Sequence, residues 1–137
     1  IGAKGDQKKD TLINIESTKD FVVNIMGEET IKPTVRTAGN YPGSVDEMKE
    51  VGLTAAASEK VKSPRVGEAR ISLECQLYRE IVLGEGENRR WIIFGEIILV
   101  HLQEDVWISG KIDHAALRAV GRLDNNAYCR TKDIFHL

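Results

Sequence analysis

Hydrophobic and polar positions alternate with a period of two over residues 70–83. The apolar positions are Ile71, Leu73, Cys75 and Leu77, and the positions between them are Ser72, Glu74, Gln76 and Tyr78. This period predicts a β-strand with two different faces. After a turn over 84–88, residues 89–103 predict a second long strand that is apolar at odd and even positions alike. Such a strand is expected to be covered on both faces, and in a chain this small a partner subunit is one source of the second cover.

The first half of the chain predicts short helices around one strand. Residues 20–26 are rich in β-branched and aromatic side chains, and they are too few for a long helix, so they indicate a strand. A helix is expected to begin near Asp10 and Thr11, either of which can cap its free amides. A second short helix is expected over 28–36, although Pro33 weakens its middle.

Two further short helices are predicted from their first residues. Residues 44–51 have the pattern of a capping box, with Ser44 as the cap and Glu47 three positions later. Residues 114–120 follow Asp113, which can cap a helix. The chain is therefore expected to be a β-rich α+β protein, in which long antiparallel strands and short inserted helices build a small barrel or sandwich.

Length, composition and charge exclude several classes of function. The 137 residues, 42% of them hydrophobic, suit one compact domain. Nineteen basic and 21 acidic residues leave a net charge of -2, which is not the basic field of a nucleic-acid-binding protein. No apolar run approaches the ~20 residues that span a bilayer, and no signal peptide is visible. Cys75 and Cys129 do not make a disulfide framework, so we expect a cytoplasmic protein.

Motifs that carry chemistry on their own are missing from the sequence. It contains no Cys-x-x-Cys, His-Glu-x-x-His, Walker loop or Gly-x-Ser-x-Gly. The three histidines, His101, His114 and His136, lack the spacing of metal ligands. His101 is interpreted as a half-buried imidazole, with a place beside a bound ligand as the alternative. The acidic pairs at 28–29 and 104–105 are expected on the solvated surface.

One local cluster suggests a ligand. Lys8, Lys9, Asp10 and Thr11 bring lysine charge and a hydroxyl to the start of a predicted helix, whose free amides favour a phosphate group. Short basic loops before helices are common, so a solvated loop is the alternative interpretation of these four residues.

Several ordered segments resemble the flavin-reductase-like, FMN-binding split-barrel family. The resemblance covers nearly the whole chain, and the order of its short pieces makes it specific. The matching pieces are Lys9-Asp10-Thr11-Leu12-Ile13-Asn14-Ile15 with Phe21-Val22-Val23-Asn24, Tyr41-Pro42, Pro64-Arg65-Val66, Leu73-Glu74-Cys75, Gly95-Glu96 with Val100-His101, and Val120-Gly121-Arg122-Leu123 with Tyr128.

The resemblance implies a homodimer of split barrels with FMN at or near the subunit interface. The family contains NAD(P)H-dependent flavin reductases and flavoredoxin-like electron carriers. It would place Lys9, Asp10 and Thr11 by the FMN phosphate. It would place Arg122 and Tyr128 near the flavin edge or the dimer partner. In such proteins the flavin performs the chemistry, which accounts for the lack of an acid–base pair, and no side chain is assigned as catalytic.

The sequence departs from the family at its beginning. Members carry upstream strands with a segment like "PNLAPFS", and nothing similar occurs here. We therefore expect residues 1–137 to be a flavin-reductase-like split-barrel domain whose N-terminal part is absent. The expected function is that of an FMN-binding, NAD(P)H-dependent flavin reductase. A non-catalytic FMN-binding electron carrier and a cofactor-free split-barrel dimer are the alternatives.

Overall fold

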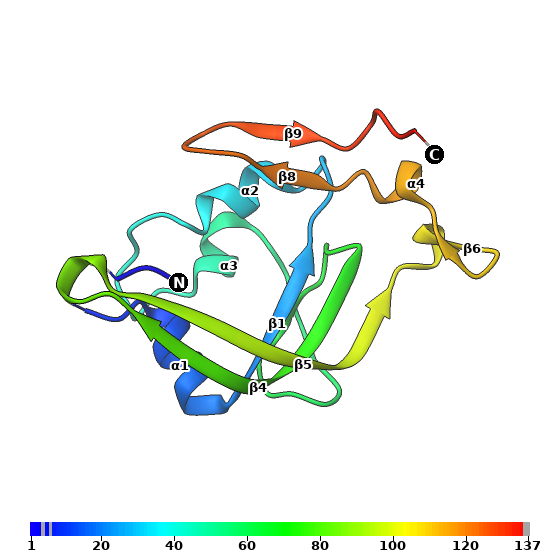
Figure 1. Ribbon diagram of the computed structural model, residues 1–137. Coiled ribbons are helices and arrows are strands. Elements are labelled where there is room, and N and C mark those ends of the chain that lie inside the picture. Colours follow the sequence, from blue (N-terminus) through cyan, green and yellow to red (C-terminus); the bar gives the residue numbers. More distant parts are fainter. Residues whose placement is uncertain (4, 6, 136–137) are drawn as a thin grey trace. The chain divides into compact units, whose positions relative to one another are not determined.

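The computed structural model describes residues 1–3, 5 and 7–135, and most of its elements are labelled in Figure 1. The chain divides into two compact units, and each is described by itself. The first comprises Ile1–Val23, Ala57–Pro64 and Leu73–Val100, and the second comprises Asn24–Ala56, Arg65–Ser72 and His101–Leu137.

Strands dominate the described elements, as predicted. The long strands β1, β4 and β5 form a three-stranded sheet in the order β1-β4-β5, and three pairs of short strands form separate two-stranded sheets, β2-β3, β6-β7 and β8-β9. Among the described residues these sheets do not join into one closed barrel. The strands are β1 (Asp20–Ile25), β2 (Ala55–Ala56), β3 (Arg65–Val66), β4 (Ile71–Leu83), β5 (Arg90–Leu102), β6 (Trp107–Ile108), β7 (Lys111–Ile112), β8 (Val120–Arg122) and β9 (Tyr128–Arg130).

The helices are short and stand between the strands. They are α1 (Asp10–Thr18), α2 (Ile31–Arg36), α3 (Glu47–Val51), α4 (His114–Leu117) and the 3-10 turns η1 (Gly86–Asn88) and η2 (Glu104–Val106). Each predicted helix is therefore present, but α2 begins three residues after the expected start. The helix after Asp113 also ends early, because Arg118 adopts a left-handed backbone with φ of 46° and residues 120–122 pair in β8.

The capping predictions were right for one helix and wrong for two. Asp113 caps α4, with its carboxylate accepting from the amides of Ala115 and Ala116 at 2.9 and 3.2 Å. Helix α3 is capped by Asp46 and not by Ser44, because Asp46 directly precedes the first turn and accepts from two of its amides. At α1 the cap position is Lys9, and no side chain caps the helix.

In the first unit, two buried carboxylates hold the segment Ala57–Pro64. Asp20 on β1 accepts from the amides of Lys62 and Ser63 at 3.0 and 3.1 Å and from the Ser63 hydroxyl at 2.6 Å. Burial alone would raise the pKa of Asp20, but these hydrogen bonds, led by the one from the Ser63 hydroxyl, hold the pKa below its ordinary value. The ionised carboxylate therefore serves as the anchor of the segment.

Glu74 on β4 is the second anchor and has no solvent exposure. Its carboxylate accepts from the backbone amides of Glu59 and Lys60 at 2.8 and 2.7 Å. The alternation over 70–83 correctly predicted the strand, but it did not indicate that Glu74 and Ser72 are buried. Both polar side chains are buried because each meets a specific partner.

The second unit has its own hydrophobic core. Met26, Val51, Leu53 and Ala69 are buried together, and Tyr41, Met48 and Val66 pack against them. Beside this core, the Asn24 side-chain oxygen accepts from the Val66 amide at 3.1 Å and from the Ser72 hydroxyl at 2.9 Å. Asn24 thus cross-links three segments of the unit and is held in a fixed orientation.

Candidate functional site

The start of α1 in the first unit collects Lys9, Asp10 and Thr11, and all three residues are exposed. The Lys9 carbonyl accepts from the amides of Leu12 and Ile13 at 2.9 and 3.2 Å. The amides of Asp10 and Thr11 find no acceptor in the described part of the chain. The prediction that Asp10 or Thr11 caps the helix is therefore wrong, and the positive end of the helix dipole is left open to a ligand.

The two neighbouring lysines differ in their surroundings. Lys8 pairs with Glu16 on α1, with 2.5 Å between Nζ and Oε1. Among residues 7–135 no carboxylate pairs with Lys9, so its ammonium group remains available. Two backbone amides, the Lys9 ammonium and the Thr11 hydroxyl form a set of hydrogen-bond donors, which fits a phosphate group. The Asp10 carboxylate is an acceptor and does not fit a direct contact with phosphate.

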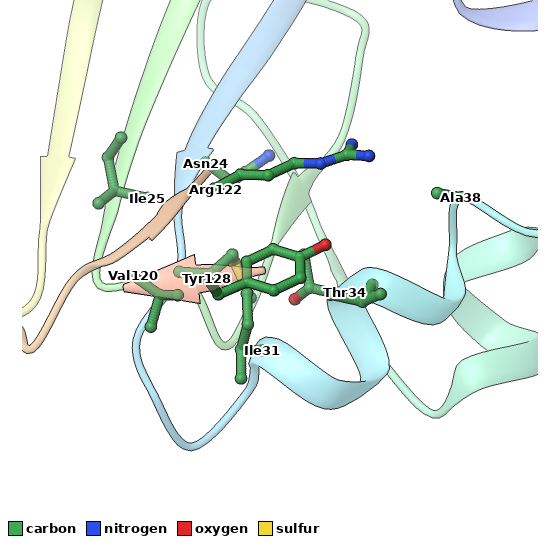
Figure 2. Close-up of a pocket in the computed structure, with 10 residues that line it drawn as sticks. Asn24, Ile25, Ile31, Thr34, Ala38, Val120, Arg122 and Tyr128 are labelled. Carbon is green, nitrogen blue, oxygen red and sulfur yellow. The ribbon is translucent and has the colours of Figure 1, made fainter. Parts of the chain in front are cut away.

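Arg122 and Tyr128 lie together in the second unit. They face each other across the antiparallel pair β8-β9, in which Arg122 is the partner of Tyr128. Directly opposed residues project from the same face of a sheet. Figure 2 shows both side chains extending in the same direction, with the Tyr128 hydroxyl above Thr34. The two residues help to line a cavity of about 290 Å³.

The cavity has an apolar lining with a few polar groups. Arg122, Tyr128, Thr34 and Asn24 supply a guanidinium, two hydroxyls and an amide. The apolar lining residues are Ile25, Met26, Ile31, Val35, Ala38 and Val120. Within the described chain the Arg122 guanidinium has no ion-pair partner. Apolar walls with few polar groups are typical of small-molecule pockets, so the cavity can take an apolar ring and an anionic group.

Sequence reasoning missed Thr34 and Asn24 as lining residues. Asn24 stood in a segment that resembles the family, but nothing local distinguished it from an ordinary strand residue. Its amide oxygen is used by Val66 and Ser72, which leaves the amide nitrogen as its remaining donor. Thr34 belongs to the short helix α2. It lines the cavity only because β8 and β9, which are distant in the sequence, supply other lining residues beside it.

The other candidate residues fall outside this cavity. His101 is half-buried, as predicted, and His136 lies outside the described residues. In the described part of the chain no group of three His, Cys, Asp or Glu side chains is placed to hold a metal ion. The acidic pairs are not simply solvated: Arg70 pairs with Glu29, at 2.7 Å, and with Asp105. Glu28 has three cationic partners.

Among the residues that the structure describes, no helix is long and apolar enough to cross a membrane. Cys75 is buried, and burial raises the pKa of its thiol. Cys129 is exposed on β9.

Comparisons with known proteins agree with the fold. An uncharacterized protein of Aquifex aeolicus is 33% identical over 123 residues, covering 89% of this chain, which spans 61% of that relative. The structure of nitrilotriacetate monooxygenase component B from Bacillus cereus matches with a TM-score of 0.92 and 30% identity, covering 100% of this chain and 69% of that one. A flavin reductase with a split barrel domain from Shewanella frigidimarina shares the fold, with a TM-score of 0.83 and 22% identity. The match covers 93% of this chain and 64% of that one.

A family model described as "Flavin reductase like domain" matches residues 3–115, which is most of the chain. With the structural similarity to split-barrel proteins, this confirms the resemblance inferred from the ordered sequence segments. The chain belongs to the flavin reductase like domain family.

Proposed function

We propose that the protein is an FMN-binding flavoprotein that acts as an NAD(P)H-dependent flavin reductase in the cytoplasm. The observation that carries the proposal is the start of α1, where uncapped amides, the Lys9 ammonium and the Thr11 hydroxyl offer hydrogen-bond donors to a phosphate. Membership of the flavin reductase like domain family supports a flavin as the molecule that carries this phosphate.

Each predicted residue has a role in this proposal. Lys9 and Thr11 bind the phosphate, and Asp10 accepts hydrogen bonds from hydroxyl groups of the ribityl chain, because its carboxylate would repel the phosphate itself. Arg122 and Tyr128 contact the flavin edge or the partner subunit. The bound flavin would supply the redox chemistry by accepting hydride from the nicotinamide. The side chains of this chain bind and orient, and no acid–base residue is required.

Reduction of the bound flavin tests the enzymatic function. Anaerobic addition of NADH or NADPH is expected to bleach the visible absorbance of the FMN-loaded protein, because the nicotinamide delivers hydride to the flavin. The visible spectrum is followed before and after mixing, with dithionite as the positive control for reduction. If FMN binds and neither nucleotide reduces it, the protein is an electron carrier. If the full-length protein binds no flavin, the cofactor-free alternative holds.

We also propose a homodimer, in which β5 lies in the interface. The prediction that both faces of this strand are covered is not met within the single chain, since Phe94 and Ile97 are 45% and 54% exposed and lie on opposite faces. The other exposed apolar residues of β5 are Ile92, Ile98, Val100 and Leu102. Apolar side chains gathered in this way are typical of a protein interface.

Light scattering at micromolar concentration is expected to give the mass of a dimer. Phe94→Glu is expected to shift the protein to a monomer, because a carboxylate buried in an apolar interface has no partner. Ile108→Glu is the matched control, since Ile108 is 52% exposed and lies on β6, outside β5. If the unmodified protein is a monomer, the homodimer proposal is wrong, and something other than a second copy covers the apolar surface of β5.

A further inference from the structure

Glu28 joins three cationic side chains in the second unit. Arg130 Nε and Arg118 Nη2 lie 3.1 and 3.3 Å from Glu28 Oε2, and Lys132 Nζ lies 3.4 Å from Oε1. The Glu28 side chain is only 12% exposed, so the prediction of a solvated surface pair was wrong for this residue. Burial alone would raise the pKa of Glu28, but hydrogen bonds from Arg118 and Arg130 and the positive charge of Lys132 hold it below its ordinary value.

The charges of this cluster do not balance. Three cations surround one carboxylate, so the net charge is +2, from three positive charges less one negative charge. Asp133 follows Lys132 in the sequence and is exposed. The charge of Glu29 also acts on Arg118, but Glu29 pairs with Arg70. With Asp133 counted and the Glu29–Arg70 pair set aside as neutral, three positive charges stand against two negative ones. Like charges held this close repel one another, and an anion would relieve the repulsion.

A cavity of about 300 Å³ opens beside the cluster. Arg118 and Lys132, two of the three cations bound to Glu28, line it together with His114, Thr131, Ala115 and Ile134. The ion pairs with Glu28 hold Arg118 and Lys132 at the edge of the cavity. Arg118 lies just after α4, and Lys132 lies just after β9. The lining thus combines fixed positive charge with a small apolar wall.

We propose that this basic cavity binds a phosphate group. A phosphate dianion carries the charge that the cluster lacks, and guanidinium and ammonium groups give it charge-assisted hydrogen bonds. Apart from His114 and Ala115, the lining residues lie beyond the segment 3–115 that matches the family model. The proposal does not depend on flavin binding, because none of these residues belongs to the start of α1 or to the cavity of Arg122 and Tyr128.

Titration with inorganic phosphate, followed by ¹H–¹⁵N NMR at constant ionic strength with chloride as the balancing salt, tests the site. Amide shifts are expected around residues 114–118 and 131–134. Lys132→Ala and Arg118→Ala are each expected to weaken the binding by about tenfold, the effect of one lost charge-assisted hydrogen bond. Lys111→Ala is the matched control, because Lys111 is exposed on β7 and does not line the cavity.

Saturable shifts whose midpoint moves to about tenfold higher phosphate with Lys132→Ala, and stays unchanged with Lys111→Ala, support the site. An absence of shifts, or equal weakening by the two lysine variants, overturns it. The source of the phosphate is separated by comparing NADPH with NADH on the flavin-free protein, since the two differ only in the 2′-phosphate. Preference for NADPH that disappears with Lys132→Ala identifies the nucleotide, and equal binding assigns the cavity to free phosphate.

Discussion

Lys9→Ala is expected to weaken FMN binding by about tenfold or more. A charge-assisted hydrogen bond from lysine to phosphate contributes about 1.5–3 kcal/mol, and 1.4 kcal/mol corresponds to a factor of ten in affinity. The helix start adds about 0.3–1 kcal/mol at an exposed end, and this part is retained in the variant. Flavin fluorescence titration at fixed salt measures the change. Riboflavin, which has no phosphate, is expected to bind the variant and the unmodified protein alike.

Lys8→Ala is the matched control for this prediction. Lys8 is adjacent and carries the same charge, but its ammonium group already pairs with Glu16, so its removal is expected to change FMN affinity little. Thr11→Ala should act in the direction of Lys9→Ala but less strongly. It should leave the helix start intact, because no side chain caps α1. If Lys8→Ala and Lys9→Ala weaken FMN binding equally, the loop is only a diffuse basic patch and the assignment of Lys9 to the phosphate is wrong.

Glu74→Ala is expected to lower the free energy of unfolding by about 3 kcal/mol. The Glu74 carboxylate has no solvent exposure and accepts from the amides of Glu59 and Lys60. Hydrogen bonds to a charged group contribute about 1.5–3 kcal/mol each, and water at the exposed segment recovers part of the loss. Urea denaturation followed by circular dichroism measures the change.

Glu80→Ala is the matched control on the same strand. Glu80 has the same side chain and the same parity as Glu74, but among the described residues its side chain forms no hydrogen bond or ion pair. Its replacement is expected to change the free energy of unfolding by less than about 0.5 kcal/mol. A loss for Glu74→Ala no larger than this would mean that the anchor of residues 57–64 does not stabilise the fold.

The sequence predicted the long strands well because their signal is local. A period of two and β-branched residues gave β4 and β5 to within about one residue at each end. The helix at Asp10 and the cap at Asp113 could be read in the same way, since each depends on neighbours a few positions apart. The family was also recognisable, because its motifs occur in a specific order.

Helix starts were less predictable when two polar residues competed. Ser44 and Asp46 both suit a cap, and only the path of the chain decided that Asp46 meets the free amides of α3. At α1 the path of the chain places Lys9 at the cap position, and the first amides of the helix have no side-chain cap. This is a stronger argument for an anion there than the residue types alone.

The sequence by itself determined the three long strands, the positions of most helices, the membership of the family and the candidate donors Lys9 and Thr11. Only the tertiary structure decided that Arg122 and Tyr128 share a cavity with Asn24 and Thr34. It alone showed that Glu28 gathers three cations from residues 118–132. The physical reason is that hydrogen-bond geometry and burial join residues far apart in the chain, whereas sequence periodicity reports only on neighbours.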